Sequence, residues 1–149
     1  MDDAAPVAVD GDSTATLLVV DDVEENRDIL VRRLRRDGYT MLAAATGEEA
    51  LARVAAGGVD LVLLDIMMPG MDGFEVLRRL RADPASADLP VVMVTAKDEG
   101  EDLDRAFELG ADDHIAKPVN IAQCRARVKK VLRRRSPTDA KRGALFTKL

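Results

Sequence analysis

Five short runs of apolar residues recur along the chain, and each is followed by a stretch in which apolar positions repeat every three or four residues. A continuous apolar run is typical of a strand buried on both faces, whereas the longer repeat is typical of a helix with one buried side. The pattern predicts strands at residues 16–20, 39–45, 59–65, 89–96 and 113–118. It predicts helices at residues 24–38, 46–58, 71–83, 101–110 and 121–135.

The spacing of apolar residues within each predicted helix identifies the side that faces the core. Thr46 is expected to cap the start of the second helix, and Gly38 the end of the first. Alternating strands and helices predict a single α/β domain, a doubly wound parallel sheet of five strands with helices on both faces. The expected inward positions are Ile29, Leu30, Leu34, Leu51, Val54, Ala55, Phe74, Leu77, Leu80, Cys124, Val128, Val131 and Leu132.

Length and composition agree with one folded domain. The 149 residues are 47% hydrophobic and 33% charged, and only 3% are aromatic, so the core must be aliphatic. We expect the domain at residues 15–135, a flexible arm at 1–14, and a basic tail or linker at 136–149. The arm lacks the basic region and long apolar run of a signal peptide or a membrane span, so a cytoplasmic protein is expected.

The single cysteine and the basic C-terminal stretch each allow two interpretations. Cys124 excludes an intrachain disulfide and is interpreted as a small packed residue, with a catalytic thiol as the alternative. The net charge is −5, yet the residues from Arg125 onward include ten Lys and Arg residues against one Asp. Such a stretch can bind nucleic acid, but Phe146 is the one aromatic residue there that could stack on a base. We prefer a solvated helix face and linker, with no nucleic acid partner.

Ionisable and hydroxyl side chains stand at the carboxyl ends of four predicted strands. Asp21 and Asp22 follow the first strand, and Asp65 ends the third. Thr95 lies at the end of the fourth strand, and Lys117 at the end of the fifth. In a doubly wound sheet these ends meet at one edge, so the five side chains are expected to share a pocket. A lone Asp after a strand is ordinarily a turn former, and it is the joint occurrence that indicates a site.

This set of side chains suits phosphoryl transfer to an aspartate. Three carboxylates cannot all remain ionised together unless a cation lies among them, and hard oxygen ligands select Mg²⁺ or a similar ion. A carboxylate beside such an ion can act as a nucleophile and form an acyl phosphate. Lys117 would offset phosphoryl charge, and Thr95 could donate a hydrogen bond to a phosphoryl oxygen.

Four segments of the chain resemble the receiver domain of bacterial two-component response regulators, the CheY-like family. They are LLVVDD, VDLVLLDIMMPGMDGFEVLRRLR, LPVVMVTA and GADDHIAKPV, and the resemblance spans about residues 15–135. The functional positions occur in order, with 30 residues from Asp65 to Thr95 and 22 from Thr95 to Lys117. The resemblance implies a flavodoxin-like fold with strand order 2-1-3-4-5.

The resemblance also implies a role for each site residue. Asp65 matches the phosphoacceptor, modified by a histidine kinase or a phosphotransfer protein. Asp21, Asp22, Asp65 and the backbone carbonyl of Met67 match the groups that hold Mg²⁺. Thr95 matches the switch hydroxyl and Lys117 the lysine that contacts the phosphoryl oxygens. Members of this family catalyse their own phosphorylation and dephosphorylation but are otherwise switches rather than enzymes.

One position departs from the usual pattern of the family. The residue three before Lys117 is commonly Tyr or Phe and swings inward on phosphorylation, but here it is His114, the only histidine. His114 is interpreted either as a pH-sensitive or altered switch residue, or as a passive planar replacement. In a different segment, the loop that follows Asp65, Pro69, Gly70 and Gly73 are interpreted as turn residues.

The leading hypothesis is a phosphorylation-dependent switch. Phosphate on Asp65 would change the face made by the fourth helix, the fifth strand and the fifth helix, which would then form a homodimer or bind a target. The alternative is the N-terminal regulatory fragment of a longer response regulator, whose enzymatic or DNA-binding output domain is not in this chain. The basic helix at residues 125–135 is typical of an element that leads into such a domain.

Overall fold

A computed structural model describes residues 15–96 and 100–134, and the arm, tail and linker expected at the two ends lie outside these residues. The five strands are β1 (Thr16–Val20), β2 (Thr40–Ala44), β3 (Leu61–Asp65), β4 (Val91–Thr95) and β5 (Asp113–Ala116). The five helices are α1 (Glu24–Arg35), α2 (Gly47–Ala55), α3 (Gly73–Ala82), α4 (Gly100–Glu108) and α5 (Ile121–Arg134). Strands and helices alternate as the hydrophobic pattern predicts. Most of these elements are one to three residues shorter than predicted.

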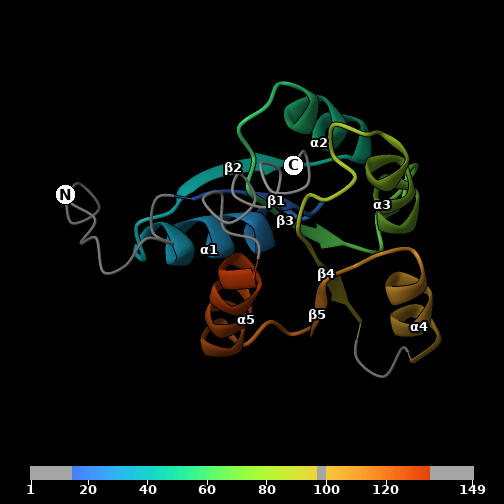
Figure 1. Ribbon diagram of the computed structural model, residues 1–149. Coiled ribbons are helices and arrows are strands. Elements are labelled where there is room, and N and C mark those ends of the chain that lie inside the picture. Colours follow the sequence, from blue (N-terminus) through green and yellow to red (C-terminus); the bar gives the residue numbers. More distant parts are fainter. Residues whose placement is uncertain (1–14, 97–99, 135–149) are drawn as a thin grey trace.

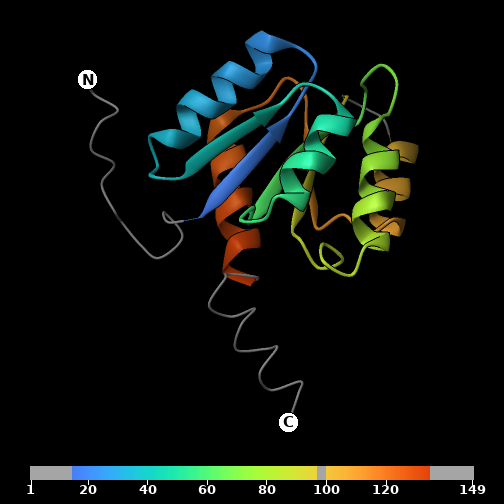
Figure 2. The same cartoon turned by 90° about the horizontal axis from the view of Figure 1, so that it is seen from above.

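The strands form one parallel sheet in the order β2-β1-β3-β4-β5, as predicted. Val20 pairs with Leu64 and Asp65 pairs with Val94, so the ends of the three central strands lie side by side. All pairings are parallel, so the carboxyl ends of the strands lie at the same edge of the sheet, and the arrows of β1 and β2 point the same way in Figure 2. The chain adds β2 on one side of β1 and then β3, β4 and β5 on the other side, so the strand order changes direction between β1 and β3. In folds of this kind ligands bind at the carboxyl ends of the strands at this point.

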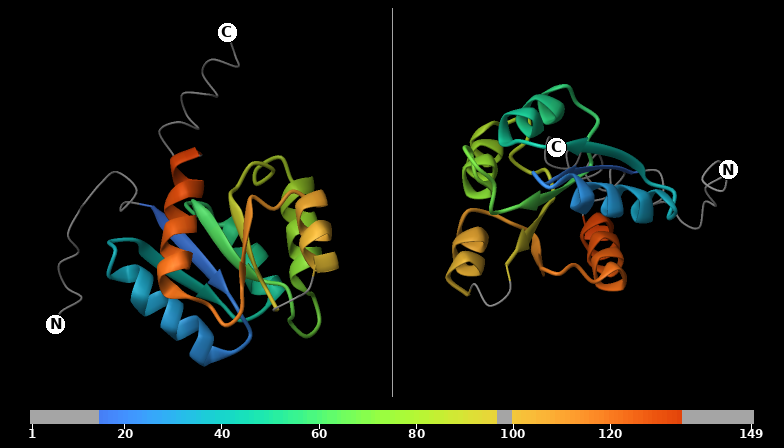
Figure 3. Two further views of the ribbon diagram at one scale, coloured as in Figure 1. Left: turned by 90° about the horizontal axis from the view of Figure 1, so that it is seen from below. Right: turned by 180° about the vertical axis from the view of Figure 1, so that it is seen from behind.

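Two hydrophobic clusters cover the two faces of the sheet, because alternate residues of each strand point to opposite sides. Leu17 and Val19 pack with α1 and α5, whereas Leu18 and Val20 pack with α2, α3 and α4. Figure 1 and Figure 3 show α1 and α5 together on one side of the sheet. Every residue of β3 and β4 is buried, which accounts for the apolar sequence of both strands up to their last residues, Asp65 and Thr95.

The predicted inward positions are mostly confirmed, with two corrections. Ile29 is 49% exposed. Leu30 and Leu34 of α1 face the sheet, and Ile29 is rotated about 100° around the helix axis from its neighbour Leu30, so its side chain points away from the core. Ala55 is also exposed, at the last residue of α2. Cys124 is buried with Val128, Val131 and Leu132, as expected for a small packed residue.

The predicted helix caps are confirmed at Thr46 and modified at Gly38. The Thr46 hydroxyl accepts a hydrogen bond from the Glu49 backbone N–H at 3.1 Å. α1 ends at Arg35 with Arg36 as its cap, and Gly38 lies beyond it at a φ of 98°, donating its N–H to the Arg35 carbonyl. Gly38 therefore closes the turn after the helix, where only glycine adopts a positive φ without strain.

None of the helices in the described part of the chain is both long and apolar enough to cross a membrane. The cytoplasmic location stays a prediction.

Candidate functional site

The three carboxylates that the sequence places at the strand ends come together at one edge of the sheet. Each offers an oxygen atom that lies within 4.8 Å of the other two. Asp21 and Asp65 are buried, at 3% and 2% exposure, whereas Asp22 is exposed. Buried carboxylates repel one another unless a cation compensates their charge.

Lys117 supplies part of the compensating charge from β5's end. Its Nζ donates a hydrogen bond to Asp65 Oδ2 at 2.9 Å and lies 3.7 Å from Asp21 Oδ2. Three carboxylates and one ammonium leave two negative charges, which is the charge that a divalent cation would neutralise. An all-oxygen donor set with one exposed member, open to water, fits Mg²⁺, which usually keeps several of its water ligands.

Burial and neighbouring charges shift the pKa values of two residues at this edge, Asp65 and Lys117. Burial raises the pKa of Asp65, the hydrogen bond from Lys117 opposes this rise, and the nearby Asp21 carboxylate adds to it. Burial alone would lower the pKa of Lys117, but the carboxylates of Asp65, Asp21 and Asp22 together raise it. Lys117 therefore stays cationic. The raised pKa of Asp65 means that its ionised form is disfavoured here, and an additional cation would stabilise that form.

Backbone amides orient the two buried carboxylates. Asp21 Oδ1 accepts a hydrogen bond from the Val23 N–H at 2.9 Å, and Arg27 donates to the Asp21 carbonyl at 2.9 Å. Asp65 Oδ1 accepts from the Met67 N–H at 3.2 Å, which leaves Oδ2 to Lys117. The side chain of Met67 is 66% exposed, so this residue contributes its backbone to the site and not its thioether.

Thr95 lies beside these groups at the end of β4. The register that pairs Asp65 with Val94 sets Thr95 one residue beyond it on the adjacent strand. Thr95 is 2% exposed, and its carbonyl accepts a hydrogen bond from the Lys117 N–H at 2.7 Å. The strand ends therefore bring together all five residues that the sequence singles out.

His114 is set apart from the carboxylates, on β5. Its ring packs edge-on against Phe107 of α4, with 5.8 Å between ring centroids and an interplanar angle of 89°. His114 Nδ1 is buried without a hydrogen bond among the described residues, and lies 3.8 Å from Asp113 Oδ1. Asp113 is held in turn by Arg127 of α5 at 2.9 Å. His114 thus links β5 to α4.

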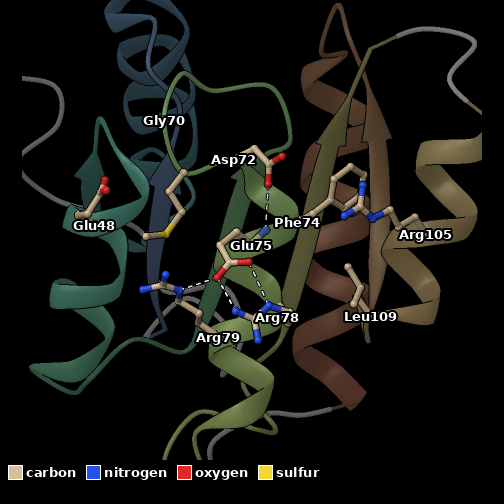
Figure 4. Close-up of a pocket in the computed structure, with 10 residues that line it drawn as sticks. Glu48, Gly70, Asp72, Phe74, Glu75, Arg78, Arg79, Arg105 and Leu109 are labelled. Atoms are coloured by element: carbon tan, nitrogen blue, oxygen red, sulfur yellow. Dashed lines mark hydrogen bonds and ion pairs between the residues drawn. The ribbon is translucent and has the colours of Figure 1, made fainter.

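A second depression lies between α2, α3 and α4, and sequence analysis did not single it out. Figure 4 shows Glu75 bonded to both Arg78 and Arg79, and the Arg105 guanidinium over the Phe74 ring, 4.3 Å from its centroid. Its lining contains none of the predicted site residues. Glu75 is paired with Arg78 and Arg79 of the same helix, and the clustered carboxylates lie elsewhere, at the strand ends.

Sequence analysis also missed two supports of the site. Arg27, which fixes the backbone at Asp21, has no signal beyond its place on a helix next to the strand end. Gly73 is not a turn residue, since it is the first residue of α3 and only Gly70 in this loop has a positive φ, at 75°. Gly73 lies against the backbone of Asp65, and such a close approach leaves no trace in the sequence.

The sequence pattern of the family described as "Response regulator receiver domain" matches residues 17–129. The chain belongs to this family. Receiver domains are phosphoacceptor switches of two-component signalling, and the acidic triad of this one is typical of the Mg²⁺ site of the family. The sequence resemblance and the fold expected from it are confirmed.

Curated relatives contain the receiver domain within longer proteins. The chain is 41% identical over 125 residues to the phosphate regulon transcriptional regulatory protein PhoB of Pseudomonas aeruginosa, covering 84% of this chain and 55% of PhoB. It is 42% identical over 120 residues to the response regulator PleD of Caulobacter vibrioides, covering 80% of this chain and 26% of PleD. The chain therefore spans about half of the one relative and a quarter of the other.

Two solved structures match this chain over nearly their own full length. A putative response regulator from Chloroflexus aurantiacus superposes with a TM-score of 0.77 at 37% identity, covering 80% of this chain and 98% of that one. The chemotaxis protein CheY4 of Vibrio cholerae superposes with a TM-score of 0.76 at 30% identity, covering 80% and 99%. The receiver fold thus accounts for most of this chain.

Proposed function

We propose that Asp65 accepts a phosphoryl group from a histidine kinase or a histidine phosphotransfer protein, and that the domain acts as a phosphorylation-dependent switch. The observation that carries the proposal is the hydrogen bond of 2.9 Å between Lys117 Nζ and Asp65 Oδ2, within a buried cluster of carboxylates. It marks Asp65 as the carboxylate that already faces a group suited to bind phosphoryl oxygens.

Each residue has a defined part in the transfer. A carboxylate oxygen of Asp65 forms a bond to phosphorus while the bond between phosphorus and the donor's imidazole nitrogen breaks, and the nitrogen keeps the electron pair. Lys117 transfers its hydrogen bond to a phosphoryl oxygen, and the Thr95 hydroxyl donates to another. Mg²⁺, held by Asp21, Asp22, Asp65 and the Met67 carbonyl, would neutralise charge on the transferring group.

The test is intact-protein mass spectrometry after incubation with acetyl phosphate and Mg²⁺. Wild-type protein should gain one phosphoryl group, about 80 Da, and Asp65→Asn should not, because it lacks the nucleophilic oxygen. Asp28→Asn is the matched control, since Asp28 is exposed on α1 and is not one of the three clustered carboxylates. Labelling that persists in Asp65→Asn, or that needs no Mg²⁺, would contradict the proposal. If acetyl phosphate fails, a phosphorylated kinase or phosphotransfer protein is the next donor.

The response to phosphorylation is proposed to involve His114. Thr95 would move toward the phosphoryl group, and the ring of His114 would repack from its contact with Phe107, which changes the face formed by α4, β5 and α5. This face would form a homodimer or bind a target. Light scattering of phosphorylated and unphosphorylated protein tests this: His114→Ala should keep phosphorylation but lose the phosphorylation-dependent association, and His114→Tyr should retain both.

The second candidate is a regulatory part of a longer response regulator with an enzymatic or DNA-binding output. The 55% and 26% coverage of PhoB and PleD favours it. The sequence of the gene around this chain distinguishes it from a stand-alone switch.

A further inference from the structure

Gly73 lies unusually close to the backbone of the proposed phosphoacceptor. A Cβ built on Gly73 would be 2.7 Å from the Ile66 Cα and closer still to the Asp65 carbonyl oxygen. Both are backbone atoms of the β3 end, which cannot rotate away as a side chain can. The φ of Gly73 is not positive, so the close approach, and not backbone conformation, is what requires glycine here.

Gly73 also closes the loop that follows Asp65. Its N–H donates a hydrogen bond to the Ile66 carbonyl at 2.9 Å, which joins the two ends of the segment at residues 67–72. This segment begins with Met67, whose N–H holds Asp65 Oδ1, and ends with Asp72, whose carboxylate caps α3 at the Glu75 N–H. The position of Asp65 and the shape of the loop therefore depend on the same contact.

Two other helices begin with glycine and provide a comparison. A Cβ on Gly47, the first residue of α2, would lie 2.8 Å from Val76 Cγ2 and 3.0 Å from Met71 Cγ, which are side-chain atoms that can move. A Cβ on Gly100, the first residue of α4, would meet nothing within 4 Å. The three glycines share the helix position and differ in what lies against them.

We propose that Gly73 is a positioning residue for Asp65: by allowing α3 to start against the Asp65 backbone, it sets the distance of the Asp65 carboxylate from Lys117 and Asp21 and fixes the loop at Met67. The inference rests on the proposed function of this site. A methyl group at position 73 would push the β3 end and the loop apart, because neither backbone can yield without moving the carboxylate.

The experiment compares Mg²⁺ affinity, by isothermal titration calorimetry, and phosphorylation by acetyl phosphate in three glycine-to-alanine variants. Gly73→Ala should bind Mg²⁺ about tenfold or more weakly and be phosphorylated correspondingly more slowly, a loss typical of displaced supports of a metal site. Gly100→Ala should match the wild type, and Gly47→Ala should fall between them. Leu77→Val, in the α3 core, lowers stability without touching the loop and should keep wild-type Mg²⁺ affinity at a temperature where it is folded.

A second measurement uses the wild-type protein, in case Gly73→Ala does not fold. Hydrogen exchange of the Gly73 amide, which bonds to Ile66, should slow when Mg²⁺ is added, while that of the Gly100 amide should not. Two results would overturn the inference: a Mg²⁺ affinity of folded Gly73→Ala equal to that of the wild type, or a hydrogen-exchange rate of the wild-type Gly73 amide that is the same with and without Mg²⁺. The proposed function is judged separately, by phosphorylation of the wild type, so the two can fail independently.

Discussion

At the scale of single residues, the site is defined by charges that the fold confines. Asp21 and Asp65 are almost fully buried, and Lys117, with 31% of its side chain exposed, is the described cation that contacts both. Removing one member of such a group leaves the others uncompensated, which costs more than the pair contributes when intact.

Lys117→Ala should therefore destabilise the metal-free protein at neutral pH. The Asp65 and Asp21 carboxylates would lose their common counter-charge, at an expected cost of about 1–3 kcal/mol of unfolding free energy, since part of the charge is screened by solvent. Urea denaturation with a chelator present measures this loss, and saturating Mg²⁺ should recover most of it. The control is Lys130→Ala, at an exposed position of α5. Equal losses in the two variants would argue against the prediction.

Cys124 should be chemically inert in the folded protein. Burial, with a contribution from the Asp37 carboxylate, raises the pKa of its thiol to about 11, so the reactive thiolate is nearly absent at pH 8. Labelling with a disulfide reagent such as dithionitrobenzoate at pH 8 should be slow in native buffer and complete within minutes in denaturant. Rapid labelling of the folded protein would restore the alternative of a reactive thiol.

At the scale of elements, the amphipathic pattern of α3 predicts which of its residues face the core but not which other elements they contact. Phe74, Leu77 and Leu80 were predicted to face the core and do so. The pattern did not reveal that Gly73 meets β3, or that Arg105 of α4 lies over Phe74. Ile29 was assigned to the wrong side of α1 because three apolar residues so close together fit a stripe in more than one way. Periodicity identifies which elements exist, whereas contacts between elements depend on tertiary packing.

The exposed face of α3 provides a pH-dependent contribution to stability. Hydrogen bonds from Arg78 and Arg79 lower the pKa of Glu75 to about 2, from an ordinary value of 4.5. A lowered pKa means that Glu75 stabilises the folded state above pH 4.5 and loses this contribution as the pH falls through about 2. Glu75→Gln should thus lower the melting temperature slightly at pH 7, with a difference from wild type that shrinks steadily below pH 4.5.

Because the Glu75 pair is exposed, its effect on stability is small, and the direct measurement is the titration itself. The side-chain carbon resonance of Glu75, followed by NMR, should titrate with a midpoint near pH 2 in the wild type. Arg79→Ala should raise this midpoint, since it removes one of the two donors. A midpoint near 4.5 in both proteins would show that the pairing does not persist in solution.

At the scale of the whole molecule, the site could be predicted because the fold has one edge where strand ends converge. Four motif segments, each ordinary alone, indicated the five residues once the parallel sheet was inferred, and Asp21, Asp22, Asp65, Thr95 and Lys117 do lie at that edge. What surrounds them, such as the Arg27 bond to the Asp21 carbonyl, could not be predicted from strand order.

Addition and removal of Mg²⁺ should change the stability of the entire domain. A ligand that binds the folded state alone, at a hundred times its dissociation constant, adds about 2.7 kcal/mol to the unfolding free energy. Calorimetry should show a melting temperature that rises with Mg²⁺ and returns to its starting value with EDTA, at constant ionic strength. Asp65→Asn should respond far less. A rise that is equal in both proteins would assign the effect to salt and not to this site.

The hydrogen bond between Lys117 and Asp65 joins residues that are 52 positions apart in the chain, and it crosses from the edge strand to the centre of the sheet. Parallel pairings of this kind form late, because the intervening chain must close a long loop before any contact compensates for the lost entropy. A partly folded chain with β1 and β3 in place would have its carboxylates together but no ammonium to face them. In the proposed switch, a chain that ends before Lys117 would therefore lack the group that faces Asp65, and it should not be phosphorylated at the rate of the complete domain.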